Sequence, residues 1–265
     1  MKKIIFLAIS VMLMFLVIGC NVNARNTVAN NASSNLSNDS VIDKQVALDN
    51  ATGINVEVCA AEVNINSYDG EDVKIAGKLS DKSKGFDINK IGNEIEIVEK
   101  GYELFGSLIN TEANKTKINI SIPSKFNGNF TFKQGAGTSK IEGIKVKKMD
   151  ITGGAGELNC GNIRFDKLDL KSGVGKVDLN LNDKCGDIDI IGGVGEVRVK
   201  MTEVGGNFRY NGGVGETNIT IPQNAPVKFL THKGVGKCEI NATTSNNEMY
   251  TFDLKVGVGA INVRN

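Results

Sequence analysis

The sequence predicts an all-β protein, a single-domain parallel β-solenoid of about seven coils, and three observations lead to this prediction. Gly-X-Gly occurs seven times in the second half of the 265-residue chain, in steps of 19, 19, 20, 20, 21 and 23 residues. Apolar and polar residues alternate on both sides of each copy, as in strands with one buried face. No segment after the N-terminal apolar run has a helical pattern.

The first element is an N-terminal export signal. Met1-Lys2-Lys3 is basic, residues 4–18 are almost entirely apolar, and Val17-Ile18-Gly19-Cys20 follows. The apolar run is shorter than the roughly 18 to 20 residues of a spanning helix, and the whole pattern is typical of a signal peptide. Its ending resembles the bacterial lipobox, so we predict a signal over 1–19 and lipidation of Cys20. The alternatives are an ordinary signal with a chance cysteine and an uncleaved anchor.

Residues 20–50 are predicted to form a disordered tether. They are rich in Asn, Ser, Ala and Val and contain neither proline nor aromatic residues. Such a composition buries too little apolar surface to offset the entropy of ordering. With the lipid anchor, the tether would hold the folded part on the extracytoplasmic side of the cell membrane.

Residues 51–125 are predicted to be a β-rich N-terminal part that caps the solenoid. Terminal coils of a stacked array are atypical because an open edge has to be protected. The segments with alternating apolar and polar residues are 54–58, 61–66, 72–76, 94–98 and 117–122.

Residues 126–265 are predicted to be the repetitive solenoid, in which each coil consists of a strand, a Gly-X-Gly corner and a second strand. The residues five and three positions before the corner, and two and four after it, are mostly apolar. Glycine suits the corner because it permits positive φ and lets the next coil approach closely. We expect the middle residue, Ala or Val in every copy, to point inward as a small plug. The last strand, ending at Asn265, would leave an open coil edge.

The repeat Ile188-Asp189-Ile190-Ile191-Gly192-Gly193-Val194-Gly195-Glu196-Val197 resembles those of the bacterial DUF4097 family. The resemblance covers roughly residues 50–265. It implies a β-rich domain at the cell surface. The family carries the label adhesin, which is an inference from shape. It also implies a link to envelope-stress or transcriptional regulators, whose genes often accompany relatives. The family supplies no established activity and no site residues.

Composition excludes several classes of function. The chain has 31 Lys and Arg against 30 Asp and Glu residues, which argues against a nucleic-acid partner and against a polybasic membrane patch. The spacing of Cys59, Cys160, Cys185 and Cys238 matches no metal pattern, and we expect these residues to be buried and apolar in character. Cys160 and Cys238 lie too far apart in the stack for a disulfide, whereas a bond between Cys59 and Cys185 stays open. No cofactor is expected.

The strongest chemical candidate is the acidic column formed by Asp150, Asp169 and Asp189. In register, their carboxylates would lie one above another at roughly 4.8 Å, a spacing that could serve Ca²⁺ or polysaccharide hydrolysis. The alternative is a solvated charged face, because outward lysines lie beside the column at positions 148, 167 and 171.

Of two further features, only the second is a candidate for contact with a partner. His232 is the only histidine, so neither a catalytic triad nor a zinc centre is supported, and we interpret it as a surface residue. The segment 101–109 interrupts the strand pattern with Tyr102, Leu104 and Phe105. It would be either a partner-binding loop or a flap over the first coil.

The leading hypothesis is a non-enzymatic, lipid-anchored surface protein that acts as an adhesin or an envelope scaffold. Its partners would be the membrane, through the anchor, and a protein or cell-surface polymer that the sequence does not identify. The alternatives are an accessory protein in envelope-stress signalling and a filament that assembles through the solenoid ends, as bactofilin-like solenoids do. An enzyme is not expected.

Overall fold

The computed structural model describes residues 41–101, 115–232 and 234–265. This part of the chain is all-β, as predicted, and its strands form one open 18-stranded sheet. No helix in it is long and apolar enough to cross a membrane. The strands are β1 (Val41–Ala47), β2 (Gly53–Tyr68), β3 (Asp72–Lys78), β4 (Phe86–Ile91), β5 (Glu94–Glu99), β6 (Lys117–Pro123), β7 (Asn129–Glu142), β8 (Lys145–Gly161), β9 (Arg164–Lys171), β10 (Val174–Leu181), β11 (Asp187–Ile191), β12 (Val194–Met201), β13 (Phe208–Asn211), β14 (Val214–Thr220), β15 (Val227–His232), β16 (Val235–Asn241), β17 (Tyr250–Lys255) and β18 (Val258–Arg264).

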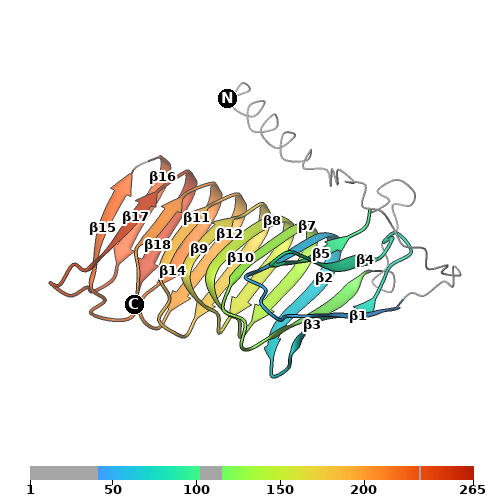
Figure 1. Cartoon of the computed structure of the whole chain (residues 1–265). Coiled ribbons are helices and arrows are strands. Elements are labelled where there is room, and N and C mark those ends of the chain that lie inside the picture. The colour runs from blue at the N-terminus through green and yellow to red at the C-terminus, as the bar shows by residue number, and fades with distance from the viewer. Residues whose placement is uncertain (1–40, 102–114, 233) are drawn as a thin grey trace, which may run out of the picture. The chain divides into compact units, whose positions relative to one another are not determined.

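Parallel pairing stacks the Gly-X-Gly copies directly over one another. Gly156 pairs with Gly175, Gly175 with Gly195, and Gly195 with Gly215. The strands before the corners form one ladder and the strands after the corners form a second (Figure 1). Each layer of the stack is therefore two strands joined at a glycine corner.

The apolar columns predicted from the sequence form the core between the two ladders. Side chains at the four inward positions of each internal layer are buried, as in Leu168, Leu170, Val177 and Leu179. In the C-terminal layers, phenylalanine side chains pack against one another within the core, and the ring centroids of Phe208 and Phe252 lie 5.2 Å apart. The predicted alternation of inward and outward side chains is thus confirmed in the strands before and after the corners.

The order of the last layers differs from the order in the sequence. The final strands β17 and β18 lie between the layer of β13 and β14 and the layer of β15 and β16. The expectation that β18 leaves an open edge is therefore wrong, since β18 is paired on both sides. The outermost strands at this end are β15 and β16 (Figure 1).

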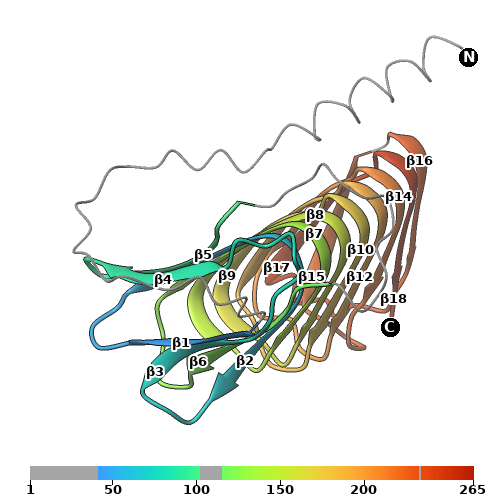
Figure 2. The same cartoon turned by 90° about the vertical axis from the view of Figure 1, so that its right-hand side faces the viewer.

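The stack begins earlier in the chain than the first Gly-X-Gly. β2 is one continuous strand that pairs in parallel with β7, and its corner consists of Cys59, Ala60 and Ala61. On the other side of β2 lie β5 and β6. Strands β3, β1 and β4 then add antiparallel pairs, which cover the N-terminal end seen in Figure 2.

The predicted disordered tether was too long. Its last part forms β1, which pairs with β3 and buries Ile42 to 4% exposure. The alternation is hard to see in the sequence because Lys44 occupies a position that would otherwise be apolar. The Lys44 ammonium instead donates a hydrogen bond of 2.8 Å to the backbone oxygen of Phe86. The predicted signal and Cys20 lie outside the described residues.

Candidate interaction surface

Two features of the backbone require glycine at the corners. At Gly195, φ is +137°, a region that L side chains rarely adopt. A Cβ atom there would lie 1.9 Å from the backbone oxygen of Gly175 in the preceding layer. Gly156, Gly175, Gly215 and Gly259 show the same positive φ and the same close approach. The corner row is therefore bare backbone on both sides of its middle residue.

The middle residues of the corners point outward, which corrects the expectation of an inward plug. Val174 is 45% exposed, and the exposure rises along the row to 79% at Val235. Pairing places these side chains one above another, since each valine is registered with the next. We call this row the valine ridge; in spatial order it consists of Val174, Val194, Val214, Val258 and Val235.

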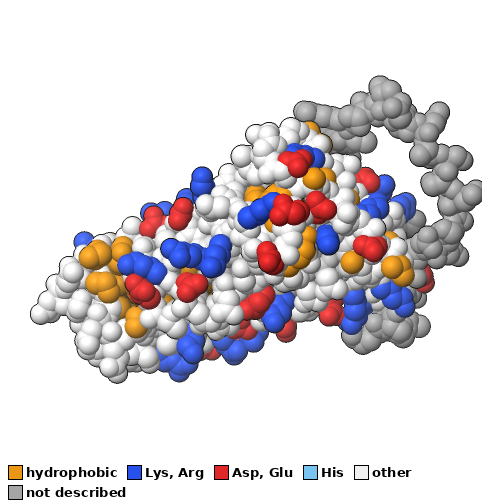
Figure 3. Space-filling view, turned by 60° about the horizontal axis from the view of Figure 1, so that its bottom comes forward, with side chains coloured by type: hydrophobic (Ala, Val, Ile, Leu, Met, Phe, Trp, Pro, Cys, Tyr) orange, Lys and Arg blue, Asp and Glu red, His pale blue; other side chains and the backbone are white. Residues whose placement is uncertain are grey.

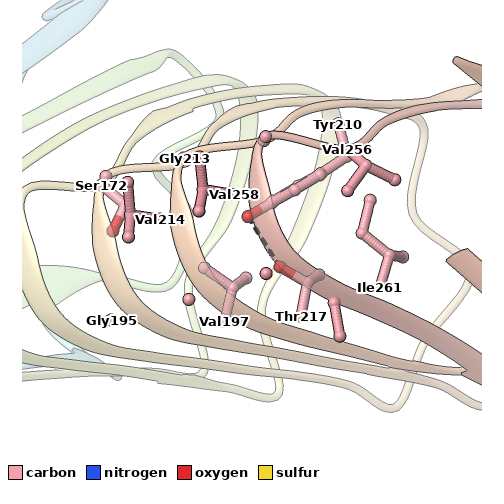
Figure 4. A pocket seen from close by; sticks show the side chains of 16 residues that line it. Ser172, Gly195, Val197, Tyr210, Gly213, Val214, Thr217, Val256, Val258 and Ile261 are labelled. Atoms are coloured by element: carbon pink, nitrogen blue, oxygen red, sulfur yellow. Dashed lines mark hydrogen bonds between the residues drawn. The ribbon is translucent and has the colours of Figure 1, made fainter. Parts of the chain in front are cut away.

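The inside of the corner is packed and offers no room for a ligand. A space of about 10 Å³ lies between the layers there, close to the minimum that a single water needs. The Thr217 hydroxyl donates to the Tyr210 hydroxyl at 2.6 Å across this space (Figure 4). Burial raises the pKa of Tyr210, which keeps the phenol neutral. The ridge outside the corner, not its interior, is accessible to a partner.

The acidic column forms in the predicted register but is neutralised by neighbouring cations. Asp150 pairs with Asp169, and Asp169 with Asp189. The Lys148 ammonium lies 3.1 Å from carboxylate oxygens of both Asp150 and Asp169, and Lys167 lies 3.1 Å from Asp169. Burial acts to raise the pKa of Asp169, but the hydrogen bonds from these two lysines outweigh it and hold that pKa below its usual value.

The next residue in the column continues this pairing. The Arg209 guanidinium lies 3.0 Å from Asp189, in the adjacent layer. In the described part of the chain, no group of three His, Cys, Asp or Glu residues is placed to hold a metal ion. On the face of the molecule in Figure 3, Lys and Arg side chains are interspersed with Asp and Glu side chains and with hydrophobic groups.

The lone histidine and the cysteines form no reactive cluster. His232 lies on β15, with Nε2 2.9 Å from a carboxylate oxygen of Asp253. The structure shows no disulfide among the cysteines that it describes. Burial raises the pKa of Cys160 to about 12 and that of Cys185 to about 11, so both thiols stay protonated at neutral pH. Tyr102, Leu104 and Phe105 lie outside the described residues.

The sequence analysis missed one buried carboxylate, that of Glu99, which accepts hydrogen bonds from the backbone of the first corner. Glu99 is 1% exposed, and its Oε2 accepts hydrogen bonds from the backbone N–H groups of Cys59 at 2.7 Å and Ala60 at 3.2 Å. Among the described residues, no earlier strand pairs with β2 at this corner, and the carboxylate supplies an acceptor there instead. Burial raises the pKa of Glu99 more than the hydrogen bonds from Ser83, Cys59 and Ala60 lower it.

Residues 51–255, which include β2 and all the glycine corners except the last, match the sequence pattern of one family. The chain belongs to the Toastrack DUF4097 family. No curated protein sequence matches it.

Solved structures resemble this Toastrack chain at low sequence identity. One is described as a putative cell adhesion protein from Clostridium sporogenes, with 16% identity, a TM-score of 0.41, and coverage of 84% of this chain and 98% of that one. Another is a putative adhesin from Bacteroides fragilis, with 15% identity, a TM-score of 0.43, and coverage of 85% and 97%. A third, described as a putative lipid binding protein from Parabacteroides distasonis, has 13% identity, a TM-score of 0.38, and coverage of 85% and 97%.

Proposed function

We propose that this chain is a non-enzymatic, lipid-anchored surface protein in which a β-solenoid of about seven Gly-X-Gly coils presents a repetitive face to another macromolecule. Cys20 would carry the anchor, and the folded part would act on the extracytoplasmic side as an adhesin or as a scaffold for an envelope component. The valine ridge is the observation that carries this proposal.

The ridge has the properties of a contact surface for a repetitive partner. Its valines recur once per layer, at roughly 4.8 Å, over a length of roughly 19 Å. They stand between rows of glycine, and they are 45% to 79% exposed. Apolar side chains that are exposed singly are ordinary on protein surfaces, but an aligned row is a patch, and such patches mark interaction sites.

Binding of isolated cell-wall fragments to membrane vesicles that carry the full chain tests this proposal. The variant Val174→Thr, Val194→Thr, Val214→Thr keeps the β-branched shape and the strand preference of each residue but makes the ridge polar. We expect it to weaken binding about tenfold, since each valine would lose part of its apolar contact.

The matched control is Val41→Thr, which changes another exposed valine far from the ridge, on β1. This control should bind like the unchanged chain. Equal binding by the ridge variant and the control would contradict the proposal, provided that both variants melt at the temperature of the unchanged chain.

Self-assembly through the end of the stack is a second candidate, and a separate observation favours it. The inward side chains of the outermost layer, Phe229, Cys238 and Ile240, are only partly buried, although residues at the same positions of internal layers are fully buried. An end layer without a cover exposes apolar core to another molecule.

A further inference from the structure

The end of the stack at β15 and β16 has an unpaired strand edge. Among the described residues, β16 pairs with β18 and with no strand on its other side. The backbone N–H and C=O groups on that side are therefore available to another strand. This edge deepens the self-assembly candidate above and does not depend on what the valine ridge binds.

The opposite end of the stack is covered by antiparallel strands, although β1 and β4 are each paired on one side only among the described residues. β1 pairs with β3, β3 with β6, and β4 with β5, all antiparallel, and Phe86 beneath them is 1% exposed. The hydrogen bond from Lys44 of β1 to the backbone oxygen of Phe86 in β4 places an ammonium group between the two outer strands. Among the described residues, the apolar core is thus covered at this end and only partly buried at the β15–β16 end. Pairing of β16 with a second β16 uses this edge in both copies, so assembly through it stops at two copies.

The charges on β16 complement those of a second β16 in antiparallel orientation. Lys237 and Glu239 flank Cys238 and lie on the opposite face of the strand from it. If two copies pair antiparallel with Cys238 opposite Cys238, Lys237 of each copy lies opposite Glu239 of the other. Opposite charges in directly facing positions stabilise a strand pair, and like charges destabilise it. Parallel pairing in register would place like charges together.

We propose that β16 is the docking edge for a second copy of this chain, which pairs with it antiparallel about a two-fold axis at Cys238 to form a closed dimer. A two-fold axis allows only antiparallel pairing of a strand with itself, and this symmetry is the commonest among protein dimers. In such a pair the two Cys238 Cα atoms lie about 4.5 to 5.5 Å apart, within the range of a disulfide. The partly buried Phe229 and Ile240 gain cover from the second copy.

Oxidative crosslinking of the full chain in cell membranes tests the dimer. Copper phenanthroline is added as the oxidant, and the products are separated on a non-reducing gel. We expect a disulfide-linked dimer that Cys238→Ala abolishes. Cys59→Ala, which removes another partly buried thiol at the opposite end, should leave the dimer intact. A dimer that persists in Cys238→Ala, or no dimer although maleimide labels Cys238 in the unoxidised chain, would overturn the proposal.

A charge exchange tests the register. Lys237→Glu should reduce the crosslinked dimer about tenfold, because both symmetric pairs become like-charged. Adding Glu239→Lys should restore it. The control Lys176→Glu alters a similar outward lysine on β10, a strand that is paired on both sides. It should leave the amount of crosslinked dimer unchanged. Failure of the double variant to restore the dimer would contradict the register.

Two readouts separate this inference from the proposed function and from misfolding. Each variant is also tested for binding to cell-wall fragments, which depends on the ridge and on a folded stack. A variant that binds fragments but does not dimerise is folded, so its loss of dimer reports on the edge. Species larger than a dimer in sedimentation of the detergent-solubilised chain would contradict closure. Intact fragment binding by an unchanged chain that is monomeric would refute the dimer and leave the surface role in place.

Discussion

At the scale of single residues, each corner glycine is fixed by the layer that precedes it. A Cβ at Gly173 would lie 1.9 Å from the backbone oxygen of Gly154, and the same relation recurs from layer to layer. Among the described residues, no preceding strand pairs with β2 at its corner, and there Cys59, Ala60 and Ala61 replace the glycines. The repeat in the sequence therefore marks every layer that has a predecessor at its corner, and it misses the first.

Gly195→Ala should lower the free energy of unfolding by about 3 kcal/mol or more, because it combines a strained φ with a clash against backbone. Gly153→Ala is the matched control: it lies in the same type of corner, but its Cβ would meet no atom nearer than 3.8 Å. Urea denaturation of both variants measures the difference. Similar stability of the two would refute the role of the corner glycines.

Glu99→Ala should lower the free energy of unfolding by about 2 kcal/mol, because it removes the buried oxygen that accepts the hydrogen bonds of the Cys59 and Ala60 N–H groups. Glu99→Gln keeps an oxygen for these donors and carries no charge, so it should be tolerated better. Chemical denaturation at a fixed pH measures both effects, and equal losses in the two variants would argue against the capping role.

The buried Glu99 carboxyl also predicts a pH dependence. Its pKa is raised in the folded state, so below the usual pKa of 4.5 both states are protonated and the buried group carries no charge. As pH rises through the folded pKa, the folded state must bury a charge and stability is lost. The free energy of unfolding of the unchanged chain minus that of Glu99→Gln should therefore fall as pH rises from the usual pKa to the raised folded pKa. Above the folded pKa this difference should level off. A difference that grows with pH would contradict the direction of the shift.

At the scale of elements, the exchange of the last two layers explains an irregularity in the repeat. The steps between corners lengthen to 21 and 23 residues for these layers, whereas the earlier steps are 19 or 20. The segment between β14 and β15 contains Pro222 and Pro226, and an eight-residue connection joins β16 to β17. The extra length lets the chain pass beyond one layer and return. The backbone N–H of Ile221 donates to the oxygen of Arg264 at 2.9 Å, which fixes β18 beside β14.

Ile261→Ala and Ile240→Ala distinguish this order from sequential stacking. Ile261, near the C-terminus, is 2% exposed in an internal layer, whereas Ile240 is partly buried in the end layer. We expect Ile261→Ala to lower the free energy of unfolding by about 3 kcal/mol and Ile240→Ala to lower it by about half as much. Thermal or urea unfolding gives both values. The reverse ranking would mean that the last strand of the sequence is also the last layer.

Most of the stack, but not its ends, could be predicted from the sequence. Local alternation determines which side chains of each strand face inward, so the columns and the corners were predicted correctly. The order of layers depends on contacts between segments far apart in the chain, which no local pattern encodes. β4 and β1 were missed because in each a lysine interrupts a short alternation of apolar and polar residues. The valine ridge was misassigned because periodicity does not show which way a residue between two glycines points.

At the scale of the whole molecule, the proposed surface role requires that the chain be anchored. Cys20→Ser should abolish incorporation of radiolabelled palmitate and release the chain from the membrane fraction, because serine cannot accept the lipid through a thioether. Cys59→Ser, which leaves the lipobox unchanged, should be labelled like the unchanged chain. Undiminished labelling of Cys20→Ser would place the lipid at another residue, and no labelling of the unchanged chain would exclude the anchor.

The valine ridge and the open edge give the molecule two separate surfaces. The ridge runs along the corners, parallel to the direction of stacking, and the unpaired edge of β16 lies at one end of the stack. In a dimer formed through antiparallel β16 strands, Val235 of each copy would lie opposite Asn241 of the other. The two ridges would then lie at opposite edges of the assembly, where each could contact a separate partner molecule.

In-cell photo-crosslinking from the ridge tests the central claim most directly. A photoreactive phenylalanine analogue replaces Val194 in the full chain, and the control places the same group at Ile91, an exposed apolar residue on β4. After irradiation, mass spectrometry identifies the captured envelope material. The proposed function predicts that one class of envelope polymer or protein is captured at Val194 and not at Ile91. Equal capture at both positions, or none at Val194, would contradict a role for the ridge in binding.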